Sequence, residues 1–247
     1  LAYTIPSYLI SITSILSVVN VQRINEAYYH GNGVDDLNKV FLSVSKIQTI
    51  VTFLLVGGFL IVGNEFVRLW LDEGRIQVYY ISCILMLTYS ITCSNALGVV
   101  ARRIQNCHIK ASIIYLGIAL SNVAFSLLFI NVFSKENAIW ACVLGTVVTY
   151  LVGHYIVMQI YDSKITKLKI ASFLKTFFFY AIASVIMYVV IKRTVELSNI
   201  VGTINLFLFK GSLYVILYFA FVCFIERKEL PDLFYKIKSK ILKRHAK

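Results

Sequence analysis

Seven long apolar stretches constrain this chain more than any other feature of its sequence. Each is 17 to 26 residues long and carries very few charges. A helix of this length crosses the roughly 30 Å hydrocarbon core of a bilayer, which takes about 20 residues. Strands of a membrane barrel would instead run for about 10 residues with alternating character. The stretches lie at residues 2–20, 47–63, 76–101, 111–133, 138–161, 170–191 and 200–225.

Composition supports the bilayer as the solvent of this chain. Hydrophobic residues make up 59% of the 247 residues and charged residues only 15%, which is too little polar surface to cover a water-soluble globule. Inside a bilayer every backbone N–H and C=O group needs a partner within the protein, and a helix provides one. We therefore predict an all-α fold, a polytopic transmembrane helix bundle with seven spans.

Basic residues alternate between sparse and dense along the connections. One alternate set of connections and the tail hold about 18 of the 24 Lys and Arg residues, and the other set holds about 5. Because basic connections remain in the cytoplasm, this pattern predicts that Leu1 lies outside and the C-terminal Lys247 inside. The same topology accounts for the net charge of +12, so we expect no nucleic-acid partner.

The connections and cysteines give no sign of a soluble catalytic unit or a metal site. Residues 134–137 alone join the fourth and fifth spans, and no connection is long enough for a soluble domain. The five cysteines form no Cys-x-x-Cys pair, and only Cys107 has a neighbouring histidine, His108, so we expect free thiols and no cofactor. Leu1 opens directly into an apolar run, from which we expect the chain to begin inside a longer protein.

The longest internal connection, residues 21–46, contains a second kind of helix. After a turn at residues 31–33, apolar residues recur at helical spacing from Val34 to Val44, and Asp35 and Asp36 occupy the first turn, where the helix dipole favours acids. We predict an amphipathic helix along the cytoplasmic face. The alternative is that these residues extend the second span.

The order span, amphipathic linker, span is followed by a short motif at residues 63–72, which reads Gly-Asn-Glu-Phe-Val-Arg-Leu-Trp-Leu-Asp. Together these features resemble the polysaccharide flippases (Wzx type) of the multidrug/oligosaccharidyl-lipid/polysaccharide exporter superfamily. Members commonly end this motif with glycine, where this chain has Asp72. Helix spacing and connection lengths match the family along essentially the whole chain.

The resemblance implies both an architecture and a function. The seven spans would correspond to helices 8 to 14 of a MATE-like fourteen-helix protein, with residues 1–161 as a partial second lobe. Residues 162–225 would be two additional spans, and residues 226–247 a basic cytoplasmic tail on membrane lipids. Such a protein would move an undecaprenyl-pyrophosphate-linked oligosaccharide across the bacterial inner membrane by alternating access, together with an N-terminal lobe of the same transporter. The glycan would feed O-antigen, lipopolysaccharide or capsule assembly.

A flippase breaks no covalent bond, so its working residues are those that make a wet polar path. Thr4, Ser7, Ser11 and Ser14 follow one another at steps of three or four and share a helix face, where they could contact sugar. The alternative is that these hydroxyls allow close packing and bond back to the helix backbone.

Four basic residues are further candidates for the substrate path. Arg23, Arg102 and Arg103 could meet a pyrophosphate at the cytoplasmic mouth, although residues that only set the topology would look the same. Lys210 lies about ten residues into the seventh span, where an unpaired lysine is costly. The favoured interpretation is that its amine reaches the outer headgroups. His154, on an otherwise apolar helix, is expected to bond to a neighbouring helix.

Two other functions remain open. A drug or cation antiporter of the same superfamily would need membrane carboxylates, and none of the seven stretches contains Asp or Glu. A membrane-embedded polysaccharide polymerase or ligase would need a large outer loop, which this chain lacks. The pair His30 and Asp35 matches the acyltransferase His-x4-Asp pattern, but that chemistry needs a soluble α/β scaffold. We therefore expect a transporter rather than an enzyme.

Overall fold

The computed structural model describes residues 1–71, 73–133, 137–197 and 202–227, and all regular structure in these ranges is helical. The sequence-based prediction of a polytopic all-α bundle is confirmed. Six helical segments are long and apolar enough to cross a membrane, and the number rises to seven if the bent pair α1–α2 is counted as one span. The helices are α1 Thr4–Val19, α2 Val21–Tyr29, α3 Val34–Leu71, α4 Gln77–Ser94, α5 Ala96–Ile104, α6 His108–Val132, α7 Ala138–Val152, α8 Met158–Lys164, α9 Ile170–Leu197 and α10 Thr203–Ile225.

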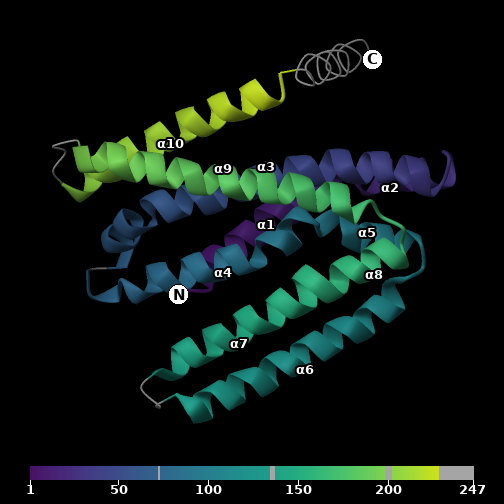
Figure 1. Ribbon diagram of the computed structural model, residues 1–247, viewed down its shortest axis with the longest axis horizontal. Coiled ribbons are helices and arrows are strands. Elements are labelled where there is room, and N and C mark those ends of the chain that lie inside the picture. Colours follow the sequence, from purple (N-terminus) through teal and green to yellow (C-terminus); the bar gives the residue numbers. More distant parts are fainter. Residues whose placement is uncertain (72, 134–136, 198–201, 228–247) are drawn as a thin grey trace, which may run out of the picture.

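Successive spans run in opposite directions through the bundle, so the connections between spans lie alternately at its two ends (Figure 1). The α2–α3, α5–α6 and α8–α9 connections lie at one end, which we call the basic end because it contains the connections rich in Lys and Arg. The C-terminal ends of α3, α6 and α9 lie at the other end, which we call the far end. Connections rich in Lys and Arg therefore alternate with poorer ones between the two ends, as the charge pattern predicted. The side of the membrane that each end faces stays a prediction.

Helix α3 corrects the prediction of an amphipathic helix lying along the membrane surface. It continues unbroken for 38 residues, so residues 34–46 extend the second span, which was the alternative. At about 1.5 Å per residue α3 is about 57 Å long, nearly twice the roughly 30 Å hydrocarbon core. Its start is fixed by Asp36, whose carboxylate accepts a hydrogen bond from the Asn32 backbone N–H at 2.9 Å.

The extension of α3 is held by tertiary contacts. Asn38 donates to the carbonyl oxygen of Lys167 at 3.0 Å and accepts from the backbone N–H of Lys169 at 2.7 Å. The rings of Phe41 and Phe173 pack with centroids 6.0 Å apart. These contacts join α3 to the connection before α9 and to the first turn of α9 itself, which favours a continuous rod over a helix on the lipid surface.

Three breaks interrupt the other spans. The axes of α1 and α2 differ by 41° where they meet at Asn20. Asn95 separates α4 from α5, and residues 153–157 form a π-helical turn between α7 and α8. Such turns often mark functional sites or places where a side chain enters the helical hydrogen-bond ladder.

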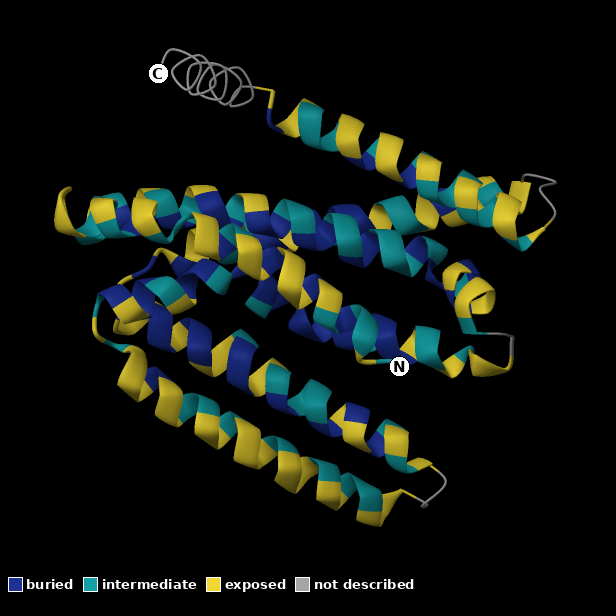
Figure 2. Ribbon diagram, turned by 180° about the vertical axis from the view of Figure 1, so that it is seen from behind, coloured by how far each residue is buried: buried dark blue, intermediate teal, exposed yellow. Residues whose placement is uncertain are grey.

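Burial is concentrated on α3 and the helices around it, while the outer helices expose apolar side chains (Figure 2). Within α6, residues 108–132, only Ala111 is buried, and exposed residues such as Ile113, Leu120 and Leu127 cover its outer face. A surface of this kind would be unstable in water but is ordinary against lipid.

Candidate functional site

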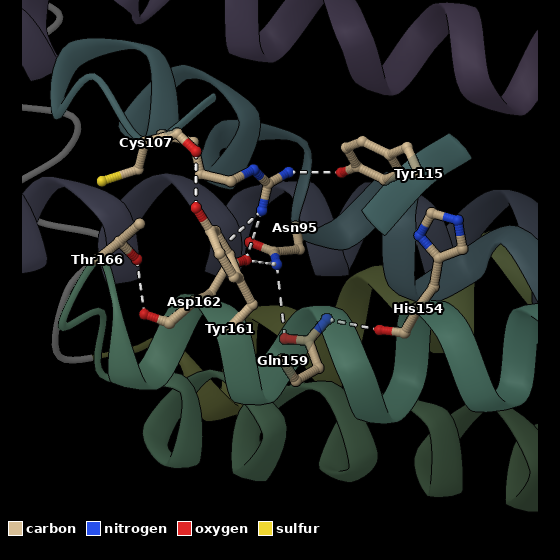
Figure 3. A network of polar contacts seen from close by, with 9 residues as sticks. Asn95, Cys107, Tyr115, His154, Gln159, Tyr161, Asp162 and Thr166 are labelled. Carbon is tan, nitrogen blue, oxygen red and sulfur yellow. Dashed lines mark hydrogen bonds and ion pairs between the residues drawn. The ribbon is translucent and has the colours of Figure 1, made fainter. Parts of the chain in front are cut away.

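A network of buried polar side chains joins α5, α6 and α8 near the basic end (Figure 3). At its centre, Arg102 Nη1 donates to Asp162 Oδ1 at 2.7 Å and to Oδ2 at 2.6 Å. The Asp162 side chain is 0% exposed and that of Arg102 4%. Leaving either charge unpaired here would be costly, so the two residues depend on each other.

The surrounding residues complete the hydrogen bonding of this ion pair. Arg102 Nη2 donates to the Tyr115 hydroxyl at 2.7 Å, and Asn95 Nδ2 donates to Asp162 Oδ2 at 3.2 Å. Asn95 sits at the α4–α5 break, so its side chain reaches the pair from the end of one helix. Helices α5, α6 and α8 and the break between α4 and α5 are thereby fixed to one another, since each contributes a side chain.

The π-helical turn brings His154 close to this network. Its ring stacks on Tyr150 at a centroid distance of 4.4 Å and lies 5.6 Å from the ring of Tyr115. Its backbone carbonyl accepts a hydrogen bond from Gln159 Nε2 at 3.0 Å. His154 is therefore packed between aromatic rings, one of them on the neighbouring helix α6.

Two further ion pairs fasten α10 along α3. Lys210 Nζ donates to Glu65 Oε1 at 2.7 Å in the last two turns of α3, and Lys46 Nζ lies 2.5 Å from Glu226 Oε2 about a third of the way along α3. The Glu65 and Lys210 side chains are 9% and 18% exposed. The second oxygen of Glu65, Oε2, is buried and has no hydrogen-bond partner among the described residues.

Two tyrosines secure α10 between these ion pairs. The hydroxyls of Tyr214 and Tyr218 donate to the α3 carbonyl oxygens of Phe53 and Ile50, each at 2.8 Å. Gly57 makes room for this approach, because a Cβ there would collide with the Tyr214 hydroxyl. Close helix contact at glycine is a common device in membrane bundles.

A polar seam runs between α1 and α3. Gln48 Nε2 donates to the Ser17 hydroxyl at 2.6 Å, while Gln48 Oε1 is buried without a partner in the part of the chain that the structure describes. The same holds for the hydroxyls of Ser45 and Thr52, on the same face of α3. Polar groups in this state hold unused hydrogen-bonding capacity.

The four hydroxyl residues predicted on the first span do share a face of α1. The Ser7 hydroxyl donates to the Thr4 carbonyl oxygen at 2.6 Å, Ser11 to that of Ser7 at 2.9 Å, and Ser14 to that of Ser11 at 2.8 Å. This is the backbone bonding that the alternative interpretation expected. Ser11 and Ser14 are exposed on the outer face of the bundle, and Thr4 and Ser7 are half-buried.

The basic candidates occupy three different settings. Arg23, on α2, and Arg103, on α5, are exposed, whereas the neighbouring Arg102 is buried against its carboxylate partner. Lys210 pairs with Glu65, and its side chain stays 18% exposed, so the reach of its amine to the outer headgroups stays a prediction. Thr4, Ser7, Ser11 and Ser14 are not brought together with Lys210 by any hydrogen bond or ion pair described above.

Sequence reasoning missed the acidic partners because it placed them outside the apolar stretches. Glu65 lies two residues beyond the second stretch and Asp162 one residue beyond the fifth, but both belong to the helices that continue through those ends. The expectation that the spans contain no carboxylate is therefore corrected. The usable signal in the sequence was the cost of a cation such as Lys210 within a span, which requires a partner without identifying it.

No group of three or more His, Cys, Asp or Glu side chains in the described ranges is arranged to hold a metal ion. The tail beyond residue 227 and Asp72 of the motif lie outside the described residues.

Comparisons with protein-family models, with curated proteins and with solved structures found no match. The fold defines the class: this chain is a polytopic helical membrane protein with six to seven candidate spans, an architecture consistent with a transporter.

Proposed function

We propose that this chain forms part of a flippase of the bacterial inner membrane, which carries a lipid-linked oligosaccharide by alternating access, and that it is not an enzyme. The observation that carries the proposal is the outward hydroxyl face of α1. Ser11 and Ser14 are exposed there, on a bundle whose other outer faces are mainly apolar. Their O–H groups donate to the backbone, and the lone pairs of the hydroxyl oxygens remain able to accept hydrogen bonds from sugar hydroxyls.

Charge placement supports the same function. Arg23 and Arg103 are exposed at the basic end, where α2 packs against α5 and the Tyr29 hydroxyl donates to the Ile104 carbonyl oxygen at 3.0 Å. Guanidinium groups suit the paired oxygens of a pyrophosphate, so these two residues are the proposed contacts. Arg102 is committed to Asp162 and serves to position the helix that carries Arg103.

The partners in this proposal are undecaprenyl-pyrophosphate-linked glycan, the membrane lipids and a first lobe of the same transporter. The residue motif at 63–72 supports the family assignment, and its Glu65 and Arg68 both form contacts within the far end of the bundle. Arg68 Nε donates to Asn64 Oδ1 at 3.1 Å.

Complementation of a strain that lacks its flippase tests the proposal, with surface polysaccharide as the readout. The full-length protein should restore the glycan, and Arg23→Ala with Arg103→Ala should reduce it while the protein remains in the membrane. Ser11→Ala with Ser14→Ala should also reduce it. The matched control is Ser112→Ala with Thr176→Ala, which removes two exposed hydroxyls that donate to their own helix backbones on α6 and α9. Failure of the unaltered protein to restore any glycan would exclude the function.

A drug or cation antiporter is the second candidate, favoured by the buried carboxylate of Glu65 with its unpartnered oxygen. Resistance to cationic drugs, lost in Glu65→Gln and not accompanied by surface polysaccharide, would establish this function instead.

A further inference from the structure

A cavity of about 280 Å³ lies between α3 and α9, two helices that run side by side (Figure 1). It lies about a third of the way along α3 and beside the first two turns of α9, on the basic side of the bundle. Its walls carry four hydroxyl groups and the Lys46 ammonium group beside the apolar side chains of Leu42 and Phe173. The space equals roughly nine water molecules at about 30 Å³ each, so a phosphodiester group fits within it.

Helix lengths place this cavity at the edge of the hydrocarbon core. Helix α10 has 23 residues and is about 35 Å long, a little more than the core of roughly 30 Å. Glu226 caps the end of α10 and pairs with Lys46, so both residues lie near the core boundary on the basic side. Ser172 lies in the first turn of α9, which at 28 residues is also longer than the core. The phosphate groups of lipids lie at this level, just outside the hydrocarbon.

The cavity contains hydroxyl donors that the protein itself leaves unused. Ser45 is 1% exposed and lines the cavity, and its Oγ is buried without a hydrogen-bond partner within the described residues. Ser43 and Ser172 add two exposed hydroxyls that also form no hydrogen bond there. The Thr176 hydroxyl differs, because it donates to the Ser172 carbonyl oxygen at 3.2 Å. A buried O–H group without an acceptor is rare in folded proteins, and phosphate oxygens are strong acceptors.

The start of α9 supplies a surplus of positive charge beside this cavity. Four lysines lie between the end of α8 and the second turn of α9, and the chain has no acidic residue between Asp162 and Glu196. Asp162 is already bound to Arg102. In the part of the chain that the structure describes, none of the four lysines forms an ion pair. They are Lys164, Lys167, Lys169 and Lys175.

The other charges close to the cavity balance one another. On the α3 extension and at the end of α10, three acids are matched in number by three bases. These are Asp35, Asp36 and Glu226 with Lys39, Lys46 and Arg227. The backbone N–H of Lys169 donates to Asn38 at 2.7 Å, which holds this lysine about one turn from Leu42 of the cavity wall. The N-terminus of α9 adds the positive end of a helix dipole with no acid in its first turn, so the surroundings favour an anion.

We propose that this cavity binds the phosphate group of an anionic phospholipid from the leaflet at the basic end. The hydroxyls of Ser43, Ser45 and Ser172 donate to the phosphate oxygens, and the surplus lysines at the start of α9 attract its negative charge. Leu42 and Phe173 contact the start of the acyl chains. The bound lipid joins α3 to α9 and is not a transported molecule, so the site is independent of the flippase function.

Native mass spectrometry of the purified full-length protein tests the proposal, with single lipids added in known amounts. The probes are phosphatidylglycerol, phosphatidylcholine, diacylglycerol, which lacks the phosphate, and inorganic phosphate. Phosphatidylglycerol should fill a saturable site and bind more tightly than the other three. Ser43→Ala with Ser172→Ala should raise its dissociation constant at least about tenfold, as expected for the loss of two hydrogen bonds to a charged group.

The matched control is Ser112→Ala with Ser163→Ala, which removes two exposed serine hydroxyls at the basic end, outside the cavity lining. It should leave lipid binding unchanged. Lys169→Gln and Lys110→Gln form a second pair, because each removes one exposed lysine close to the start of a helix at the basic end. Only Lys169→Gln should weaken binding, whereas a general attraction between lipids and a basic surface would weaken both equally.

Ser45→Ala tests the buried donor separately. It should weaken lipid binding without lowering the unfolding midpoint of the lipid-free protein, because the hydroxyl has no partner to lose among the described residues. The proposal is overturned by the absence of a saturable site for phosphatidylglycerol, or by equal binding of phosphatidylcholine or diacylglycerol. Equal weakening by the test and control variants, or binding of inorganic phosphate in place of the lipid, would overturn it as well.

Discussion

Replacing Arg102 with methionine removes the cation from the most deeply buried ion pair described here and leaves Asp162 alone in the protein interior. Asp162 is 0% exposed on its side chain, and its two oxygens accept from Arg102 at 2.7 and 2.6 Å. Removing one partner of such a pair typically costs about 3 to 5 kcal/mol, because the other charge stays desolvated. For a chain of this size, about 2 to 4 °C per kcal/mol gives a fall of about 6 to 20 °C in the unfolding midpoint.

Thermal unfolding of the purified protein in nanodiscs measures this loss. Arg103→Met is the control, because Arg103 carries the same charge one residue away but is exposed. This variant should shift the unfolding midpoint by less than about 2 °C. The double variant Arg102→Met with Asp162→Leu should recover more than half of the loss, because no buried charge then remains unpaired. Equal shifts in Arg102→Met and Arg103→Met, or no recovery in the double variant, would refute the reasoning.

Two other predictions follow from packing and charge. Gly57→Ala should destabilise the attachment of α10, by about 1 to 3 kcal/mol in unfolding, because its Cβ would collide with the Tyr214 hydroxyl. Gly58→Ala should destabilise the protein less, because its Cβ would lie 3.4 Å from the nearest atom of the Tyr214 ring. A lower thermal unfolding midpoint for Gly58→Ala than for Gly57→Ala would contradict this packing. In a cysteine-free background, Arg103→Cys should react with a membrane-impermeant thiol reagent only after the cells are opened, and Arg193→Cys in intact cells. Labelling of the first in intact cells would overturn the predicted orientation.

The spans could be predicted because their signal is local. An apolar run long enough for the bilayer is contained within a single segment, and the fifth predicted span, residues 138–161, differs from the observed Ala138–Lys164 only at one end. The same locality limited the prediction at residues 34–46, where an amphipathic pattern fits both a surface helix and an extended span. Contacts such as those of Asn38 with residues 167 and 169, distant in sequence, decide between them.

The candidate sites were harder to predict because their chemistry depends on distant partners. Lys210 pairs with Glu65 across 145 positions, and Arg102 pairs with Asp162 across 60. The cost of an unpaired charge in lipid predicted that such residues face protein, water or an anion, but it could not name the partner. The hydroxyl face of α1 was predictable from spacing alone, since helical periodicity fixes which residues share a side.

Helix α3 is so long that a small tilt displaces its two ends by several ångströms. A continuous rod of about 57 Å that pivots by about 10° at its midpoint carries each tip through about 5 Å. Because α10 is tied to this rod by Lys46 with Glu226, about a third of the way along it, and by Glu65 with Lys210 near its far end, a tilt of α3 would carry α10 with it. A tilt about the midpoint moves the two ends of α3 in opposite directions.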